Sequence, residues 1–282
     1  MGIGQAGFRT AGVIGWPVAH SRSPMLHSFW LHRYGIPGAY LPFPVQPGRM
    51  AAALRGLPAL GLAGCNVTVP HKAEAAALVD RIDDAARRVG AVNLVVVEAD
   101  GSLSGSNTDG FGFLANLREA CPGWRGDAGP AVVLGAGGGA RSAVASLLDS
   151  GAPEVRLVNR SRARAEQIAA EIGGNIVPLG WDSSEAALAD AALLVNTTTL
   201  GMVGQPALDL ALHRLPVTAV VYDIVYNPLW TPLLLTARAR GNAVVGGLGM
   251  LLHQARPSFA AWFGVLPDIT PELRQAVEST IG

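Results

Sequence analysis

The sequence has little of the chemistry that crosslinks a chain, spans a membrane or binds a metal. Only two cysteines, Cys65 and Cys121, occur in 282 residues, and they form neither a CxxC pair nor a metal-ligand spacing. We therefore expect no disulfide framework, no metal site and a reducing, cytoplasmic environment. No apolar run approaches the roughly 18 residues that cross a bilayer. The N-terminal segment also lacks the charged and apolar regions of a signal peptide.

Charge is scarce and balanced. Lys plus Arg number 21 and Asp plus Glu number 21, so the formal net charge is zero. This balance argues against a broad attraction to nucleic acid or to an acidic membrane. No basic stripe or aromatic stacking motif supports a nucleic-acid role either. Since half of the residues are apolar, the chain is expected to fold, and its length allows two domains.

Short β-branched runs alternate with Ala-, Leu- and Arg-rich stretches along the chain. Strands are predicted at residues 10–15, 38–45, 63–69, 91–98, 131–135, 155–159, 193–198, 219–225 and 242–247. Helices are predicted at 23–35, 73–90, 140–151 and 162–173, and again after Gly249. This alternation is typical of an α/β protein with parallel sheets and crossover helices. The Gly- and Pro-rich stretch at 117–130 marks the approach to a second domain.

A glycine-rich loop follows the strand predicted at 131–135. Gly135, Gly137 and Ala140 form a G-x-G-x-x-A pattern that opens a helix. Glycines at these positions permit a tight turn and let backbone N–H groups approach a pyrophosphate at the helix N-terminus. Glycine-rich turns also arise for packing reasons alone. Here the strand, loop, helix and second strand fall within a unit of about 30 residues, which favours dinucleotide binding.

The end of the next predicted strand lacks a carboxylate. An NAD-selective site places Asp or Glu there to accept hydrogen bonds from the ribose hydroxyls. This chain has Asn159, Arg160 and Ser161, followed by Arg162 and Arg164. Guanidinium groups suit a 2′-phosphate through paired hydrogen bonds, so the pattern predicts NADP. The alternative is an exposed, basic start to a helix.

Lys72 follows a strand-like run and a proline in the segment NVTVPHK. Pro70 suits the first turn of a helix. Lys72 would then lie beside a helix N-terminus, where the backbone dipole disfavours a cation. A purely structural lysine is better placed at the other end of a helix. The position favours a lysine that releases its proton during chemistry, the alternative being a surface residue.

Other polar groups gather where predicted strands end. Ser21 and Ser23 precede a helix that begins with proline, and their hydroxyls are placed to donate to an anion. Asn93 lies in an otherwise apolar predicted strand, and Asp109 immediately precedes a predicted helix. Each has a structural alternative: Ser23 and Asp109 as helix N-caps, and Asn93 as a hydrogen-bonded core amide.

Taken together, the motifs resemble one family. HSRSP, NVTVPHK, GAVN, NTDGFGF, GAGGGAR, NRSRARA, YDIVYNPLWTPLL and GGLGMLLHQARPSF resemble shikimate dehydrogenases in order and spacing, from about Val13 to Phe259. The resemblance implies a two-domain α/β fold: an N-terminal α/β substrate-binding catalytic domain at 1–109, to which 247–282 return, and a Rossmann-type NADP-binding domain at 110–246. It also implies an active site in the cleft between the two.

The resemblance assigns roles to individual residues. Lys72 and Asp109 would form the catalytic acid–base pair. Ser21 and Ser23 would hold the substrate carboxylate, with Tyr226 nearby. The ring hydroxyls would be bound by Asn66, Thr68, Asn93, Asp109 and Gln254.

For the cofactor, the resemblance places the pyrophosphate on Gly135, Ala136, Gly137, Gly138, Gly139 and Ala140. The 2′-phosphate would lie against Asn159, Arg160, Ser161 and Arg164. The nicotinamide side would be lined by Thr197, Thr198, Thr199, Ile224, Gly247 and Met250. For Met250, an ordinary core position is an equal alternative.

The expected activity is the NADP-dependent, reversible reduction of 3-dehydroshikimate to shikimate in the pathway to chorismate and the aromatic amino acids. The partner is a small molecule rather than nucleic acid or a membrane, and the protein is a monomer or homodimer. Leu94 stands where the family usually has threonine, and Ile224 where methionine is common. These departures leave open a paralogue that acts on quinate or a related polyhydroxy ring acid.

Overall fold

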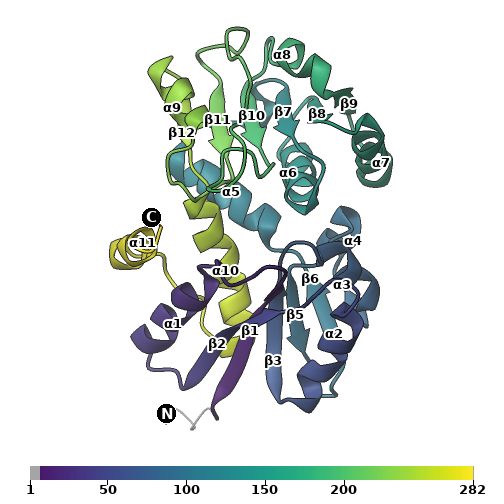
Figure 1. The fold of residues 1–282 in the computed structure, drawn as a ribbon, viewed down its shortest axis with the longest axis vertical. Coiled ribbons are helices and arrows are strands. Elements are labelled where there is room, and N and C mark those ends of the chain that lie inside the picture. Colours follow the sequence, from purple (N-terminus) through teal and green to yellow (C-terminus); the bar gives the residue numbers. More distant parts are fainter. Residues whose placement is uncertain (1–6, 282) are drawn as a thin grey trace. The chain divides into compact units, whose positions relative to one another are not determined.

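The computed structural model describes residues 7–281. Residues 1–6 and 282 lie outside the described residues. They belong to the predicted substrate-binding domain (1–109 with 247–282), and residues 1–6 are also part of the segment examined for a signal peptide. The chain divides into two compact units, whose elements are labelled in Figure 1. Unit 1 comprises the chain up to Thr108 together with Gln254–Thr280, and unit 2 comprises Asp109–His253. No helix in the described part of the chain is long and apolar enough to cross a membrane.

Unit 1 contains a six-stranded sheet in the order β2-β1-β3-β5-β6-β4. Its elements are β1 (Arg9–Gly15), α1 (Ser23–Arg33), β2 (Gly38–Pro44), α2 (Met50–Ala59), β3 (Leu62–Val67), α3 (Lys72–Leu78), β4 (Arg81–Ile82), α4 (Asp84–Val89), β5 (Leu94–Val97), β6 (Leu103–Ser106) and α11 (Pro271–Glu278). β1 runs parallel to β2 and β3, but β5 is antiparallel to β3 and β6. The expectation of parallel sheets therefore holds only in part in unit 1, where the short turn at Gly101 returns β6 antiparallel to β5.

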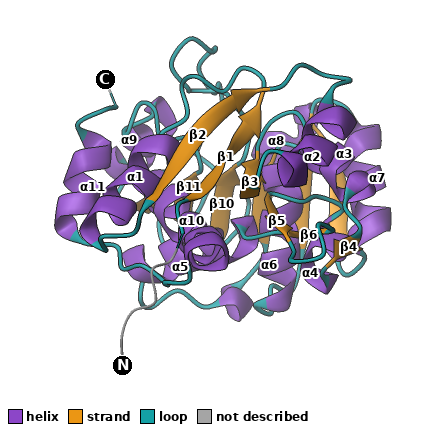
Figure 2. Cartoon of the chain, turned by 90° about the horizontal axis from the view of Figure 1, so that it is seen from below, coloured by secondary structure: helices purple, strands orange, loops and turns teal. Residues whose placement is uncertain are grey.

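Alternation along β3 separates the two faces of this sheet. Cys65 and Val67 pack into an apolar cluster with residues of α2 and α3, among them Leu54 and Ala75. Asn66 lies between them in sequence, so its side chain faces the opposite side of the sheet. Helices lie on both sides of the strands in Figure 2. β3 thus presents a polar side chain on the face opposite α2 and α3.

The single helix predicted at 73–90 is two helices. α3 ends at Leu78 because Val79 adopts an extended conformation. A short strand, β4, follows, and the Asp83 side chain then caps α4 by accepting a hydrogen bond from the Ala86 N–H. The Ala- and Arg-rich composition favoured one continuous helix, but the pairing of β4 with β6 overrides this preference.

Unit 2 contains a second six-stranded sheet, in the order β12-β11-β10-β7-β8-β9, with parallel neighbours throughout. Its elements are α5 (Asp109–Ala120), β7 (Ala131–Leu134), α6 (Gly138–Asp149), β8 (Val155–Asn159), α7 (Arg162–Ile172), β9 (Ile176–Gly180), α8 (Ser184–Ala187), β10 (Leu193–Asn196), β11 (Val220–Asp223), α9 (Pro232–Ala239) and β12 (Ala243–Val245). The last long helix, α10 (Leu248–Phe263), begins in unit 2 and ends in unit 1.

The strand order of unit 2 identifies its ligand-binding edge. Counted from β7, the order is that of a doubly wound Rossmann sheet, and its direction reverses between β7 and β10. β7 and β10 are buried along their whole length, as expected of strands covered by helices on both faces. Ligands of such sheets bind outside the carboxyl ends of the strands at this reversal.

Candidate functional site

Buried hydrogen bonds connect the polar side chains of unit 1. The Asn66 Nδ2 donates to the Asn93 carbonyl oxygen at 3.0 Å. The Asn93 Nδ2 donates to Thr108 Oγ1 at 3.0 Å, and Thr108 Oγ1 in turn donates to the Gln254 carbonyl oxygen at 3.0 Å. The structure therefore brings together Asn66, Asn93 and Gln254, three of the predicted substrate-binding residues, through a threonine between them.

Asn93 occupies a different local position from the one predicted. It precedes β5 rather than lying inside it, and its N–H donates to the Ser106 carbonyl oxygen. Its Oδ1 accepts a hydrogen bond from the Thr108 N–H at 2.8 Å, so the side-chain amide is fixed at both ends. The interpretation of Asn93 as a hydrogen-bonded core amide is thus correct as a description of its structure, and a fixed amide is also pre-organised for a ligand.

Ser21 and Ser23 lie at the start of α1. Ser23 is the first residue of the helix and is buried, whereas Arg22 occupies the N-cap position without a side-chain capping bond. The alternative that Ser23 is the N-cap is therefore wrong. The Ser23 N–H donates to Ser21 Oγ at 3.3 Å, which leaves the Ser21 hydroxyl proton for another acceptor. Thr68, also predicted to bind substrate, is half-buried just beyond β3.

The two predicted catalytic residues both begin helices. Lys72 is the first residue of α3, and His71 is its N-cap, so Pro70 precedes the helix instead of lying in its first turn. Lys72 is half-buried, and its backbone carbonyl oxygen accepts a hydrogen bond from the Val92 N–H at 2.9 Å. Asp109 is buried at the start of α5. Asp109 belongs to unit 2 and Lys72 to unit 1.

In unit 2 the glycine-rich loop lies at the carboxyl end of β7. Gly135 has φ +105°, in the left-handed region, and a Cβ there would lie 2.9 Å from Thr197 Oγ1. Thr197 follows β10, and its hydroxyl donates to the Leu134 carbonyl oxygen at 2.6 Å. α6 then begins at Gly138 without a side-chain cap, so its first N–H groups are not covered by a capping side chain. This arrangement fits a pyrophosphate.

The arginines beyond β8 differ in their partners. Arg162 forms an ion pair with Glu166 at 3.0 Å. Arg160 and Arg164 are exposed, and neither forms an ion pair within residues 7–281. The Asn159 Nδ2 donates to the Ser161 carbonyl oxygen at 2.9 Å and shapes the turn. Two unpaired guanidinium groups and no carboxylate at this strand end fit a 2′-phosphate better than free ribose hydroxyls.

A buried carboxylate, not predicted from the sequence, organises the neighbouring loops. Asp223 ends β11 and is fully buried. Its Oδ1 accepts hydrogen bonds from Asn196 Nδ2 and from the Val225 N–H, each at 3.0 Å, and its Oδ2 accepts one from Thr231 Oγ1 at 2.7 Å. Asn196 Oδ1 in turn accepts from the Thr198 hydroxyl at 2.7 Å. Asp223 therefore holds the segments that contain the predicted nicotinamide-side residues.

Replacing Asp223 with asparagine should remove part of the pH dependence of stability. Burial raises the pKa of Asp223 from 3.8 to about 6, although its hydrogen bonds oppose this shift. The folded protein thus holds this proton more tightly, and wild-type stability falls as the pH rises through that window. We expect Asp223→Asn to gain up to about 3 kcal/mol relative to wild type between pH 4 and pH 7. Urea unfolding at each pH measures this, and parallel pH profiles for the two proteins would contradict it.

The remaining predicted residues, Tyr226, Ile224, Gly247 and Met250, belong to unit 2. Tyr226 and Met250 are half-buried in unit 2, whereas the serines with which Tyr226 was grouped lie in unit 1. A Cβ on Gly139 would lie 3.1 Å from Ile224 Cδ1, so Ile224 adjoins the glycine loop. Gly247 packs so closely on the Ile224 carbonyl oxygen that a Cβ there would lie 2.1 Å from it.

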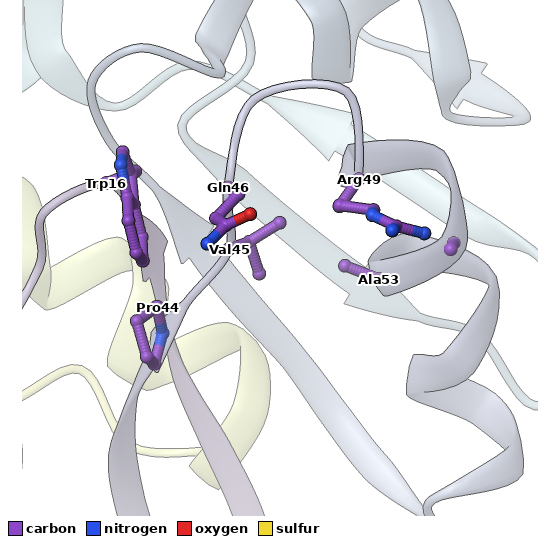
Figure 3. Close-up of a pocket in the computed structure, with 7 residues that line it drawn as sticks. Trp16, Pro44, Val45, Gln46, Arg49 and Ala53 are labelled. Carbon is purple, nitrogen blue, oxygen red and sulfur yellow. The ribbon is translucent and has the colours of Figure 1, made fainter.

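An open hollow elsewhere in unit 1 contains none of the predicted residues. It encloses about 350 Å³ and is lined by Trp16, Pro44, Val45, Gln46, Arg49, Ala52 and Ala53. In Figure 3 Gln46 lies between Trp16 and Arg49. Since these side chains make no hydrogen bond to the buried network, we do not include the hollow in the candidate site.

The sequence analysis predicted Lys72 from its motif but missed Asp223, and each of these residues has a further signal in the sequence. Asp223 is a carboxylate at the end of an apolar strand, a position where a charge needs partners. Lys72 is the only lysine in the sequence, and every other residue among the 21 Lys and Arg is arginine.

Comparisons with known proteins show the family of the chain. Three family models match: the shikimate dehydrogenase substrate binding domain at residues 13–95, shikimate / quinate 5-dehydrogenase at 126–203 and the shikimate 5'-dehydrogenase C-terminal domain at 247–278. A shikimate dehydrogenase (NADP(+)) from Rhodospirillum rubrum is 60% identical over 273 residues, covering 95% of this chain and 96% of the relative.

Solved structures are similar over nearly the whole chain. Shikimate 5-dehydrogenase from Thermus thermophilus, in complex with NADP(H) and shikimate, has a TM-score of 0.84 at 37% identity and covers 96% of this chain and 99% of its own. Quinate dehydrogenase from Corynebacterium glutamicum, in complex with NAD, has a TM-score of 0.89 at 29% identity, with coverages of 96% and 99%. The chain therefore belongs to the shikimate dehydrogenase family.

Proposed function

We propose that this protein is an NADP-dependent shikimate dehydrogenase that interconverts 3-dehydroshikimate and shikimate. The observation that carries the proposal is the hydrogen-bond network of unit 1, which fixes the side-chain amides of Asn66 and Asn93 and holds the Gln254 backbone beside them through Thr108. The name of the R. rubrum relative, which is 60% identical, supports the same activity. Residues 1–109 with 247–282 would be the substrate-binding catalytic domain, and 110–246 the NADP-binding domain.

The cofactor assignment follows the carboxyl edge of the second sheet. The loop from Gly135 to Ala140 would hold the pyrophosphate, and Arg160 and Arg164 the 2′-phosphate. The segments that Asp223 fixes, including Thr198 and Ile224, would line the nicotinamide side together with Gly247 and Met250. When bound, NADP would accept the hydride from the substrate carbon whose hydroxyl is oxidised.

Substrate binding would use both hydroxyls and amides. Ser21 and Ser23 would hold the carboxylate, with Tyr226 nearby. The amides of Asn66, Asn93 and Gln254, with the Thr68 hydroxyl, would bind the ring hydroxyls and orient the reacting carbon.

Proton transfer would belong to Lys72 and Asp109. Oxidation of a hydroxyl to a ketone releases a proton, and the reverse reaction needs one for the developing alkoxide. Lys72 would accept or return that proton. Asp109 would bind the same hydroxyl and orient the ammonium group.

Arg160→Ala should weaken the use of NADP but not that of NAD. A charge-assisted hydrogen bond to a phosphate contributes about 1.5–3 kcal/mol, so we expect KM for NADP to rise roughly 10- to 100-fold while KM for NAD stays unchanged. Arg162→Ala is the matched control, because Arg162 already pairs with Glu166. Steady-state kinetics with each cofactor measure the effect. Equal losses for NADP and NAD would show that Arg160 does not read the 2′-phosphate.

The activity itself is tested by the appearance of reduced nicotinamide with shikimate or quinate, each with NADP and with NAD. The proposal expects efficient turnover with shikimate and NADP. Preferred turnover of quinate would place the protein with the quinate-active members of the family and direct attention to Leu94, which pairs with Asn66 in the sheet. Cys65 and Cys121 are both free thiols, in keeping with our proposal of a cytoplasmic enzyme. We further propose that it is active as a monomer or homodimer.

A further inference from the structure

The hydroxyl of Tyr40 connects two of the proposed substrate-binding residues. Tyr40 lies in β2 and Asn66 in β3, on either side of β1. The Tyr40 hydroxyl donates to Asn66 Oδ1 at 2.7 Å, and it also shares a hydrogen bond with the Ser23 side chain. All three side chains are buried. One hydroxyl thus lies between the residue proposed for the carboxylate and a residue proposed for the ring.

The Tyr40 ring is held by its neighbours. It stacks on the His27 ring with centroids 4.0 Å apart and planes 2° from parallel. His27 is fully buried, and neither of its ring nitrogens has a hydrogen-bond partner within residues 7–281. Burial lowers the pKa of His27 to about 3, so it stays neutral and packs as an aromatic ring. Burial also raises the pKa of Tyr40, so its hydroxyl keeps its proton and remains a donor.

The contacts of Asn66 determine which way its amide faces. Its Nδ2 donates to the Asn93 carbonyl oxygen at 3.0 Å and to Ser258 Oγ at 2.9 Å. Turning the amide round would place Oδ1 against that carbonyl, two acceptors at hydrogen-bond distance, and this orientation is therefore excluded. Both amide hydrogens are used within the protein. Only a lone pair of Oδ1 remains for a ligand.

We propose that Tyr40 is a positioning residue that, with Ser258 and the Asn93 carbonyl oxygen, fixes Asn66 as a pure hydrogen-bond acceptor and so selects a ligand group that donates. The inference rests on the proposed function, in which Asn66 contacts the ring. A ring hydroxyl satisfies this polarity, whereas a ketone or carboxylate oxygen at the same position leaves two acceptors facing each other. Neither Tyr40 nor Ser258 need touch the ligand.

Tyr40→Phe tests the inference because it keeps the stacked ring and removes only the hydroxyl. We expect KM for shikimate to rise roughly three- to tenfold, as for the loss of one neutral hydrogen bond, with kcat and KM for NADP nearly unchanged. Tyr34→Phe is the matched control. The Tyr34 hydroxyl accepts a hydrogen bond from the Asp268 N–H, outside the network, so both KM values should stay at wild-type levels.

A second variant and a double variant distinguish failure of the inference from failure of the proposed function. Should Tyr40→Phe fail to fold, Ser258→Ala removes the acceptor at the other end of Asn66 and should show the same selective rise in KM for shikimate. In an Asn66→Ala background, Tyr40→Phe should raise KM for shikimate little further, since the amide that Tyr40 positions is gone. If the wild-type protein turns over shikimate but KM for shikimate is unchanged in Tyr40→Phe or Ser258→Ala, only the inference is overturned. Absence of wild-type turnover would overturn the proposed function and the inference with it.

Discussion

Lys72→Ala is expected to lower kcat by roughly 10²–10⁴, the range for loss of a general acid–base group, with a much smaller effect on KM for shikimate. Lys72 is the first residue of α3 and is half-buried. It is also the only lysine in a chain that otherwise uses arginine. Stopped-flow or steady-state formation of NADPH measures the effect.

The Lys72→Arg variant distinguishes proton transfer by Lys72 from binding of the substrate by its charge. It keeps the positive charge but not the ability to release a proton at working pH, so it should be nearly as slow as the alanine variant. If Lys72 only anchors the substrate by charge, the arginine variant will instead keep most of the activity. Near-wild-type kcat in Lys72→Ala would rule out the assigned acid–base role altogether.

Gly64→Ala is expected to destabilise the protein by more than about 3 kcal/mol, the largest stability effect that we predict. Gly64 lies in β3 with φ +148°, and a Cβ there would lie 2.0 Å from the Val95 carbonyl oxygen and 2.4 Å from Trp262 Nε1. The Trp262 Nε1 donates to that same carbonyl at 3.0 Å. The methyl group would therefore force apart β3, β5 and the end of α10, with little freedom to relax.

Gly56→Ala provides the control for this substitution. Gly56 lies in α2, and a Cβ there meets nothing within 4 Å. Alanine should stabilise that helix by about 0.5–1 kcal/mol. Urea unfolding of both variants measures the difference, and equal stabilities would contradict the tight packing described around Gly64.

The central strands of unit 2 could be predicted from the sequence, although β9, α8 and α9 were missed, and unit 1 was predicted less well. In unit 2 each buried strand is a short apolar run, and the glycine loop marks where the first helix begins. In unit 1 the prediction joined α3 and α4 and missed the antiparallel return of β6. Both errors concern β6: its pairing with β4 overrode the local helix preference, and the turn at Gly101 returned it antiparallel to β5.

The candidate site shows the same division. Lys72, Asn66 and Asn93 were predicted because their motifs are local in sequence. Tyr40 and Ser258 were not, since each acts through Asn66 from a distant part of the chain. Only the folded structure brings these side chains within hydrogen-bond distance of it.

The most direct test of the central claim is the transfer of hydrogen itself. Shikimate carrying deuterium on the carbon that bears the oxidised hydroxyl would be incubated with NADP and the purified protein, and the NADPH formed would be analysed by mass spectrometry. A shikimate dehydrogenase transfers that hydrogen to the nicotinamide, so we predict NADPH that carries the deuterium. NADPH without deuterium, or no NADPH at all, would contradict the assignment.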